Sequence, residues 1–188
     1  MQSKRHVRGS LFAEYVRMIR RRKDIDWTSL LGPDDGALVS STIVRDAWYP
    51  MDAFERLGNA IFDAIAAGDL ERVRLWGRFS ASEQALIHPT LVAPRDPVES
   101  INRFRVLRST WFDFDALEVS MLHDDESKIF IAYHMGAKAE EAASWQTLGF
   151  FEGLVELAGA TDVDARFAQR TWAGDARTLV SLRWRSGS

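Results

Sequence analysis

The chain has 188 residues, a formal net charge of -3 and no cysteine. Hydrophobic residues make up 46% and charged residues 27%, which is ordinary for a globular protein, so we expect one domain over residues 1–188. The acidic charge argues against a protein that holds nucleic acid, and no apolar run reaches the length of a membrane span. The lack of cysteine excludes disulfides and thiolate-bound metals, and without a signal-type apolar segment we expect a cytoplasmic location.

The first 112 residues carry helical periodicity. Apolar residues at a 3.6-residue spacing predict a helix that begins at Ser10, its expected N-cap. Residues 26–36, which include Gly-Pro-Asp-Asp-Gly at 32–36, are predicted to be largely loop, although Trp27, Leu30 and Leu31 could form a short helical turn. Further helices are predicted over 51–67, from 70 to about 91 and from 98 to about 111. These segments form a helical half, about 9–112.

From residue 114 the apolar period changes from 3.6 to 2, which predicts strands. One hairpin is expected over 117–133 and a second over 163–184, on either side of a helix from Lys138 to Ala158. Gly149 and Gly153 lie on that helix and indicate the close approach of a neighbouring element. We therefore predict an α+β fold, with N-terminal helices packed on a small antiparallel sheet and a hairpin, helix and hairpin over 114–185.

No residue pattern indicates catalysis. The sequence has no Gly-x-Ser-x-Gly elbow, no Ser-x-x-Lys pair and no glycine-rich phosphate loop. The acidic pairs Asp34-Asp35 and Asp124-Asp125 lie where turn chemistry explains them. We expect a protein that is not an enzyme and has no catalytic residues.

The first two dozen residues have a basic bias, for which a solvated helix face is the favoured interpretation. The alternative is a contact between this basic N-terminal helix and an acidic protein partner or a lipid surface. The residues concerned are Lys4, Arg5, Arg8, Arg17, Arg20, Arg21, Arg22 and Lys23.

Several short motifs, in this order, resemble those of a known family. They are Val7-Arg8-Gly9-Ser10-Leu11-Phe12, Trp48-Tyr49-Pro50, Gly68-Asp69-Leu70 followed by Gly77-Arg78, the helix 150–159, and Gly174-Asp175. The chain resembles an uncharacterised bacterial domain family, paralogous in gliding predatory bacteria. That family is related to 4-vinyl-reductase-type and haem-NO-binding-associated domains, and shares a fold group with the small subunits of the TRAPP complex.

The resemblance implies a fold like that of TRAPP subunits and of NO-signalling ligand-binding domains. It also implies a homodimer and an apolar cavity between helices and sheet, which in relatives takes aromatic effectors, a tetrapyrrole or an acyl chain. Some relatives hold zinc with cysteines that follow the Gly-Asp turn. Here Ala176, Arg177 and Thr178 follow Gly174-Asp175, so we expect no zinc.

Histidine spacing offers no metal site. The four histidines are His6, His88, His123 and His134. One haem-ligating histidine stays conceivable at His134, because the related domains include haem binders, but a surface or satisfied strand histidine is favoured. We expect no metal and no cofactor.

The seven tryptophans are numerous for this length, and large aromatic residues either fill a core or line a pocket or interface. Trp145 lies off the apolar stripe of the long helix and is expected to make a contact outside the core. A ligand pocket is expected at Trp48, Tyr49, Trp111, Phe150 and Phe151.

Together these features favour a non-enzymatic, small-molecule-binding regulatory module, sensor-like, with an apolar cavity. Its expected partners are a second copy, an apolar or aromatic small molecule and an acidic protein. One alternative is a protein-interaction or assembly platform that works as a homodimer without a ligand. Another is an enzyme that reduces or isomerises a bound ligand.

Overall fold

The computed structural model describes residues 5–186. The chain divides into two compact units: the first contains residues up to 69 together with 109–114, and the second contains 70–108 and 115 onward. The helices of residues 70–107 belong to the same unit as the four-stranded sheet. A single domain over 1–188 stays a prediction.

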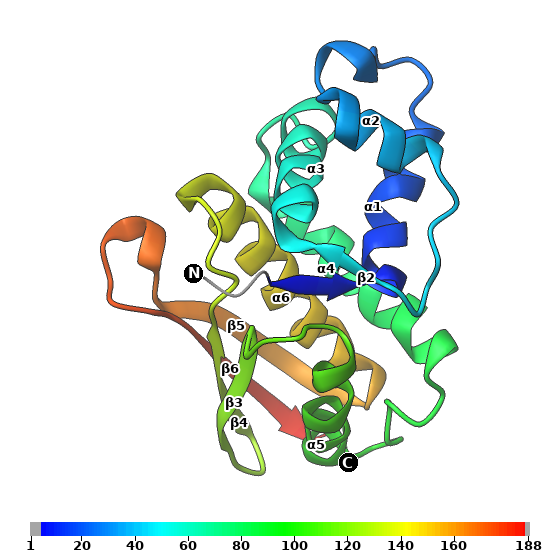
Figure 1. The fold of residues 1–188 in the computed structure, drawn as a ribbon. Coiled ribbons are helices and arrows are strands. Elements are labelled where there is room, and N and C mark those ends of the chain that lie inside the picture. Colours follow the sequence, from blue (N-terminus) through cyan, green and yellow to red (C-terminus); the bar gives the residue numbers. More distant parts are fainter. Residues whose placement is uncertain (1–4, 187–188) are drawn as a thin grey trace. The chain divides into compact units, whose positions relative to one another are not determined.

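The first unit consists of helices and one short strand pair (Figure 1). Strand β1 (His6–Arg8) runs antiparallel to β2 (Trp48–Pro50), with Val7 opposite Tyr49. Its helical elements are α1 (Gly9–Arg21), the 3-10 turn η1 (Trp27–Ser29), α2 (Pro33–Ser40) and α3 (Met51–Ala64). Between α1 and α3, the Tyr15 and Phe54 rings stack at 4.2 Å, which extends the apolar contact of the two helices.

The prediction that Ser10 caps the first helix is wrong. The N-cap residue is Arg8, and it makes no side-chain cap hydrogen bond. Strand β1 leads directly into α1, and the Gly9 N–H donates to the Ala47 carbonyl at 2.8 Å. A tertiary backbone contact thus satisfies a donor for which the sequence suggested a local side chain.

The prediction of a loop over residues 32–36 is also wrong, since helix α2 begins at Pro33. Proline suits the first helical position, and the two following aspartates suit the positive N-terminal end of the helix dipole. Asp35 is buried, and its carboxylate accepts hydrogen bonds from Nε and Nη2 of Arg56 at 2.7 and 2.8 Å. This ion pair anchors α2 to α3, so the Asp34-Asp35 pair serves a helix start rather than a turn.

The second unit combines helices with an antiparallel four-stranded sheet of order β3-β4-β6-β5. The helical elements are α4 (Leu70–Ile87), α5 (Pro97–Leu107), α6 (Ala137–Leu157) and the 3-10 turn η3 (Thr171–Ala173). The strands are β3 (Leu117–Leu122), β4 (Glu126–Ile131), β5 (Ala160–Gln169) and β6 (Thr178–Ser186). A 3-10 turn, η2 (Arg108–Thr110), follows α5. The predicted hairpin, helix and hairpin are confirmed.

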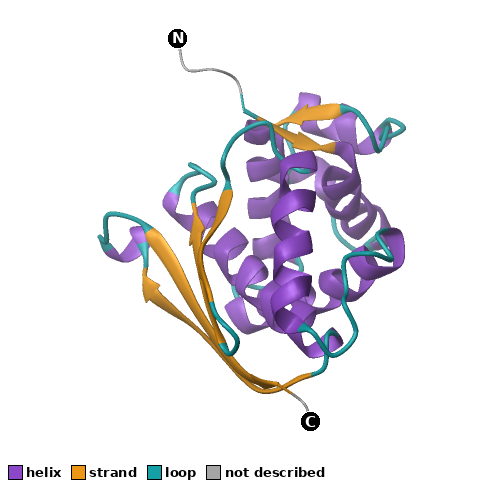
Figure 2. Ribbon diagram, turned by 90° about the horizontal axis from the view of Figure 1, so that it is seen from below, coloured by secondary structure: helices purple, strands orange, loops and turns teal. Residues whose placement is uncertain are grey.

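Helix α6 crosses one face of the four-stranded sheet, which forms the slanting layer of strands in Figure 2. The alternation of β4 and β6 places Ile129 opposite Val180 in the register, and both are fully buried. On the helix side, Phe151 and Leu154 are fully buried, and Phe151 meets Phe104 of α5 edge-on at 4.8 Å. Burial of these large side chains is the main source of stability for this unit.

Helices α4 and α6 approach each other at backbone distance. A Cβ atom on Gly77 would overlap the backbone oxygen of Gln146, and one on Gly149 would overlap that of Arg74. A Cβ atom on Gly153 would come within 2.8 Å of the Arg78 oxygen. The predicted close approach at Gly149 and Gly153 is therefore confirmed, and its partner is α4.

Candidate ligand pocket

The connection between β4 and α6 is tied to the first turn of α6 by Glu140. The Glu140 side chain is buried, and its carboxylate oxygens accept the backbone N–H of Tyr133 at 2.9 Å and of Met135 at 2.8 Å. Between these donors His134 adopts a left-handed backbone conformation with φ of 57° and is exposed. The N–H groups of Tyr133 and Met135 therefore point toward Glu140, whereas His134 between them points outward. This alternation sets the backbone path of the connection.

Tyr133 fixes the same connection to the middle of α6. Its side chain is buried, and its hydroxyl forms a 2.6 Å hydrogen bond with the hydroxyl of Thr147, which also donates to the Ala143 carbonyl. Burial raises the pKa of the Tyr133 phenol, with a further rise from the charge of Glu140, while the Thr147 hydrogen bond opposes the shift. The phenol therefore stays neutral and serves a structural role.

The loop between β5 and β6 forms the opposite wall and is held by its own hydrogen bonds. Asp175 Oδ2 accepts the Arg170 N–H at 2.6 Å, and the hydroxyls of Thr171 and Thr178 lie 3.0 Å apart. Gly174 closes the turn with a left-handed φ of 98°, as the Gly-Asp pair in the sequence indicates. The side chains of this wall thus project from a defined turn.

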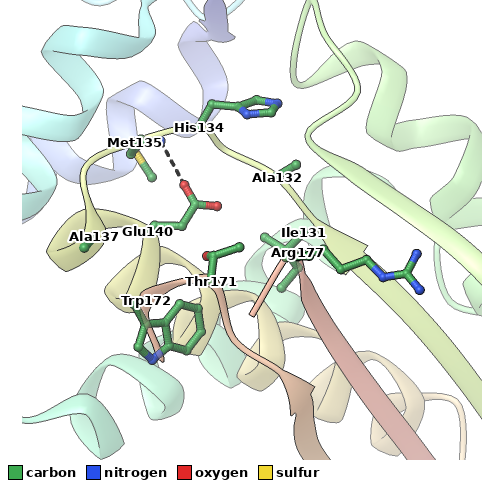
Figure 3. Close-up of a pocket in the computed structure, with 10 residues that line it drawn as sticks. Ile131, Ala132, His134, Met135, Ala137, Glu140, Thr171, Trp172 and Arg177 are labelled. Carbon is green, nitrogen blue, oxygen red and sulfur yellow. Dashed lines mark hydrogen bonds between the residues drawn. The ribbon is translucent and has the colours of Figure 1, made fainter. Parts of the chain in front are cut away.

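These two walls enclose a cavity of about 370 Å³, which we call the β4–α6 pocket (Figure 3). Its volume is at the lower end of the range typical for small-molecule sites. It is partly open to solvent. The lining residues are Ile131, Ala132, His134, Met135, Ala137, Glu140, Thr171, Trp172, Ala176 and Arg177.

Apolar surface and one fixed cation characterise this pocket. Figure 3 shows Trp172 on the side of the β5–β6 loop and Met135 on the side of the β4–α6 connection. The guanidinium of Arg177 lies 4.2 Å from the centroid of Phe130, and its Nε donates to the Gln169 side chain at 3.0 Å. Both contacts hold the guanidinium against Phe130, and in Figure 3 it points away from Trp172 and Met135. The Glu140 carboxylate is already engaged by two backbone donors, so it contributes little as an acceptor for a ligand.

An aromatic chain links the pocket to helix α6. The indole of Trp172 meets Phe167 edge-on at 5.2 Å, and Phe167 meets Trp145 edge-on at 5.4 Å. The expectation that Trp145 makes a contact other than with the helix's apolar stripe is confirmed, because its partner lies on β5.

The residues expected to line a pocket are placed differently. Trp48, Tyr49 and Trp111 belong to the first unit, whereas Phe150 and Phe151 belong to the second. Trp48 is exposed beneath the Arg8 guanidinium, Tyr49 stacks on the buried Phe12 and Trp111 is buried. Phe150 and Phe151 are buried and meet each other edge-on. None of the five lines the β4–α6 pocket. A site shared by these five residues stays a prediction.

The sequence reading missed the residues that do line the β4–α6 pocket. No motif marks Glu140 within the long predicted helix, and Trp172 is one of seven tryptophans. The available signal was the Gly174-Asp175 turn, which brings Trp172 and Arg177 to the two ends of one loop.

The basic N-terminal segment is largely engaged within the first unit. The Arg8 guanidinium lies 4.8 Å from the Trp48 ring, Arg20 donates to the carbonyls of Val39 and Ser41, and Arg22 pairs with Asp24. Lys4 lies outside the described residues. A second cavity of about 380 Å³ lies along α1, where the arginines at 17, 20 and 21 line it.

Residues 5–186 contain neither a cluster of metal-binding side chains nor a helix that could span a membrane. Within that range no three histidine, cysteine, aspartate or glutamate side chains gather in a way that would hold a metal ion. None of the helices described there combines the length and the apolar character needed to cross a bilayer.

Comparisons with known proteins give a fold. No family model matches the chain, and no curated protein matches it. Among solved structures, an unliganded Fe(II) H-NOX mutant from K. algicida superposes with a TM-score of 0.67 at 12% identity, covering 95% of this chain and 96% of that one. An H-NOX protein from S. oneidensis in the Fe(II)NO state gives 0.64 at 10% identity, covering 95% and 99%.

A third structure, whose subject is haem distortion in the H-NOX family, gives a TM-score of 0.62 at 13% identity and covers 96% of both chains. At these identities the likeness establishes the fold alone. It confirms the predicted α+β fold, of the type found in H-NOX domains.

Proposed function

We propose that this chain is a small-molecule-binding regulatory module without enzymatic activity, and that its ligand occupies the β4–α6 pocket. The observation that carries the proposal is the placement of Trp172, Met135 and Arg177 around one solvent-open space of about 370 Å³. The fold supports it, since the H-NOX structures include one with NO bound to Fe(II). A sensor-like role follows from the position of the pocket between two separate backbone segments.

The pocket favours a small ligand with an apolar or aromatic body. Trp172, Met135 and Ile131 offer apolar surface. A carboxylate or carbonyl group on the same molecule would draw the Arg177 guanidinium away from Phe130 and Gln169 to pair with it. Such a ligand would touch the β4–α6 connection and the β5–β6 loop together. Its binding would favour one relative placement of these segments, which is the basis of a population shift.

Neither Tyr133 nor His134 is placed in this structure as an axial ligand for haem. A haem iron takes an axial ligand from histidine, cysteine, methionine or tyrosine. The chain has no cysteine, and the buried Tyr133 hydroxyl is bonded to Thr147. His6 Nδ1 lies 2.5 Å from Asp113, and His134 is exposed at the pocket rim. We therefore propose a module that works without haem, in which His134 is a surface residue.

A second candidate function is an assembly platform that acts as a homodimer. The observation that favours it is a row of exposed large apolar side chains on α4, among them Leu75, Phe79 and Leu86. The arginine-lined cavity along α1 is where an acidic protein partner would dock. We also propose a cytoplasmic location. We further propose a relation to 4-vinyl-reductase-type domains, TRAPP subunits and bacterial paralogues.

Ligand-induced stabilisation tests the proposal. Thermal unfolding of the full chain would be followed with a panel of aromatic carboxylic acids and fatty acids. A ligand at 100 times its Kd adds about 2.7 kcal/mol, which raises the Tm by roughly 5–10 °C for a chain of this size.

Two variants assign the response to the pocket. We expect Trp172→Ala and Arg177→Ala to abolish the shift, and Arg166→Ala, at an exposed position on β5, to leave it unchanged. If no compound in the panel stabilises the wild-type chain, the ligand-binding function fails. If the ligand still raises the Tm of both pocket variants, the ligand binds outside the β4–α6 pocket.

A further inference from the structure

Helix α4 carries an exposed apolar row on the side that faces away from α6. Leu75 is 60% exposed, Phe79 66% and Leu86 82%. The opposite side of the helix is buried and includes Val73, Gly77 and Ala81. Large apolar side chains that gather on one surface mark interaction sites more often than scattered ones do.

The row follows the spacing of a coiled-coil seam. Positions 72, 75, 79, 82 and 86 are separated by alternating steps of three and four residues, as in the a and d positions of a heptad. They are occupied by Arg72, Leu75, Phe79, Ser82 and Leu86. Helical residues at this spacing share one face, which matches the exposure of the three apolar members.

We propose that a second copy of this chain packs its own α4 antiparallel against this seam. In antiparallel helix pairs with a two-fold axis, a positions meet d positions of the partner. With the axis beside residue 77, Leu75 meets Phe79 of the partner subunit, and the same contact recurs on the other side of the axis. This inference rests on the homodimer of the second candidate function.

Charge selects this register and this partner. Arg72 and Glu83 are 11 residues apart, so they lie about 20° apart around the helix and roughly 16 Å apart along it. In the antiparallel register, Arg72 lies beside Glu83 of the partner subunit at both ends of the contact. An isologous interface requires such self-complementarity, with opposite charges on one flank at opposite ends.

The seam comprises a single helix, so the contact is small. Interfaces below about 1,200 Å² are typical of weak association, and we expect a dimer with a Kd roughly in the micromolar range. A concentration series is therefore the appropriate measurement.

Analytical ultracentrifugation of the full chain tests the surface. The wild type is expected to pass from monomer to dimer over the micromolar range, whereas Leu75→Glu and Phe79→Glu stay monomeric. The matched control is Val106→Glu, because Val106 is 75% exposed on α5 and outside the seam. Far-UV circular dichroism and thermal unfolding verify that each variant folds.

Charge exchange tests the register. Arg72→Glu and Glu83→Arg each place two like charges side by side across the interface, so each is expected to raise the dimer Kd at least tenfold. The double variant restores the opposite charges and is expected to restore the Kd. A wild type that stays monomeric throughout overturns the homodimer itself. A dimer that tolerates Leu75→Glu and Phe79→Glu overturns only the α4 assignment, and failure of the double variant to recover overturns the antiparallel register.

Discussion

Arg74 on α4 and Glu152 on α6 form a two-point ion pair across the glycine contact of these helices. Arg74 Nε donates to Glu152 Oε2 at 2.8 Å, and Nη2 donates to the other carboxylate oxygen. The Glu152 side chain is only 3% exposed, whereas that of Arg74 is 28% exposed. The hydrogen bonds to Glu152 raise the pKa of Arg74, against a smaller opposing effect of burial. The Arg74 guanidinium thus offsets the cost of burying the Glu152 carboxylate, which lies where α4 and α6 pack closely.

Removal of Arg74 is expected to destabilise the protein. Arg74→Met leaves Glu152 buried without its charged partner, and we expect a loss of about 2–3 kcal/mol, toward the low end for a broken buried pair because Arg74 is partly solvated. The double variant Arg74→Met/Glu152→Met should recover most of this loss. Urea unfolding measures both, with Arg166→Ala, an exposed arginine on β5, as the control. Equal losses in the single and double variants would contradict this account.

Gly149 is expected to tolerate no side chain. In Gly149→Ala the new Cβ would overlap the backbone of Arg74, so α4 and α6 must separate, at a cost of about 3 kcal/mol. Gly36→Ala is the matched control, because Gly36 lies in helix α2 with open space around it and should gain about 0.5–1 kcal/mol. Differential scanning calorimetry distinguishes the two directions. A neutral Gly149→Ala would argue against the close contact.

Glu140 is expected to hold the β4–α6 connection. Glu140→Ala removes the acceptor of the Tyr133 and Met135 N–H groups, and we expect a loss of about 2 kcal/mol. Hydrogen exchange should accelerate at these two amides of the β4–α6 connection more than at the amides of α6. The neighbouring Glu141→Ala serves as control. Unchanged protection at both amides would show that the carboxylate does not hold them.

Alkaline pH is expected to act through Tyr133. Its phenol has a folded-state pKa raised above the ordinary value of 10, so its stabilising contribution is complete below pH 10 and is lost as the pH rises beyond it. Unfolding titrations above pH 9.5 should therefore show a falling stability that is reduced in Tyr133→Phe. That variant should lose about 1 kcal/mol at neutral pH, where it lacks the hydrogen bond to Thr147. Ionisation of all tyrosines near pH 10 in the folded protein would contradict the assignment.

Local patterns were sufficient where one segment decides its own structure. The change of period near residue 114 predicted the hairpins, and the spacing of Gly149 and Gly153 predicted a close neighbour. Where a distant group intervened, prediction failed. Helix α2 begins where glycine, proline and two aspartates indicated a loop, because Arg56 on α3 pairs with the buried Asp35.

The sequence by itself determined which segments become helix and strand in the second unit, that no cysteine chemistry is available, and that two glycines face a neighbouring element. Those properties depend on side-chain volume, backbone freedom and apolar spacing within one stretch of chain. Only the tertiary structure decided that α4 is that neighbour, that Glu140 closes the β4–α6 connection and that Trp172 and Arg177 share a pocket with Met135. Residues 131–140 and 171–177 meet because β4 and β6 pair in one sheet. Strand pairing over such a separation is set by the packing of the whole unit rather than by either segment.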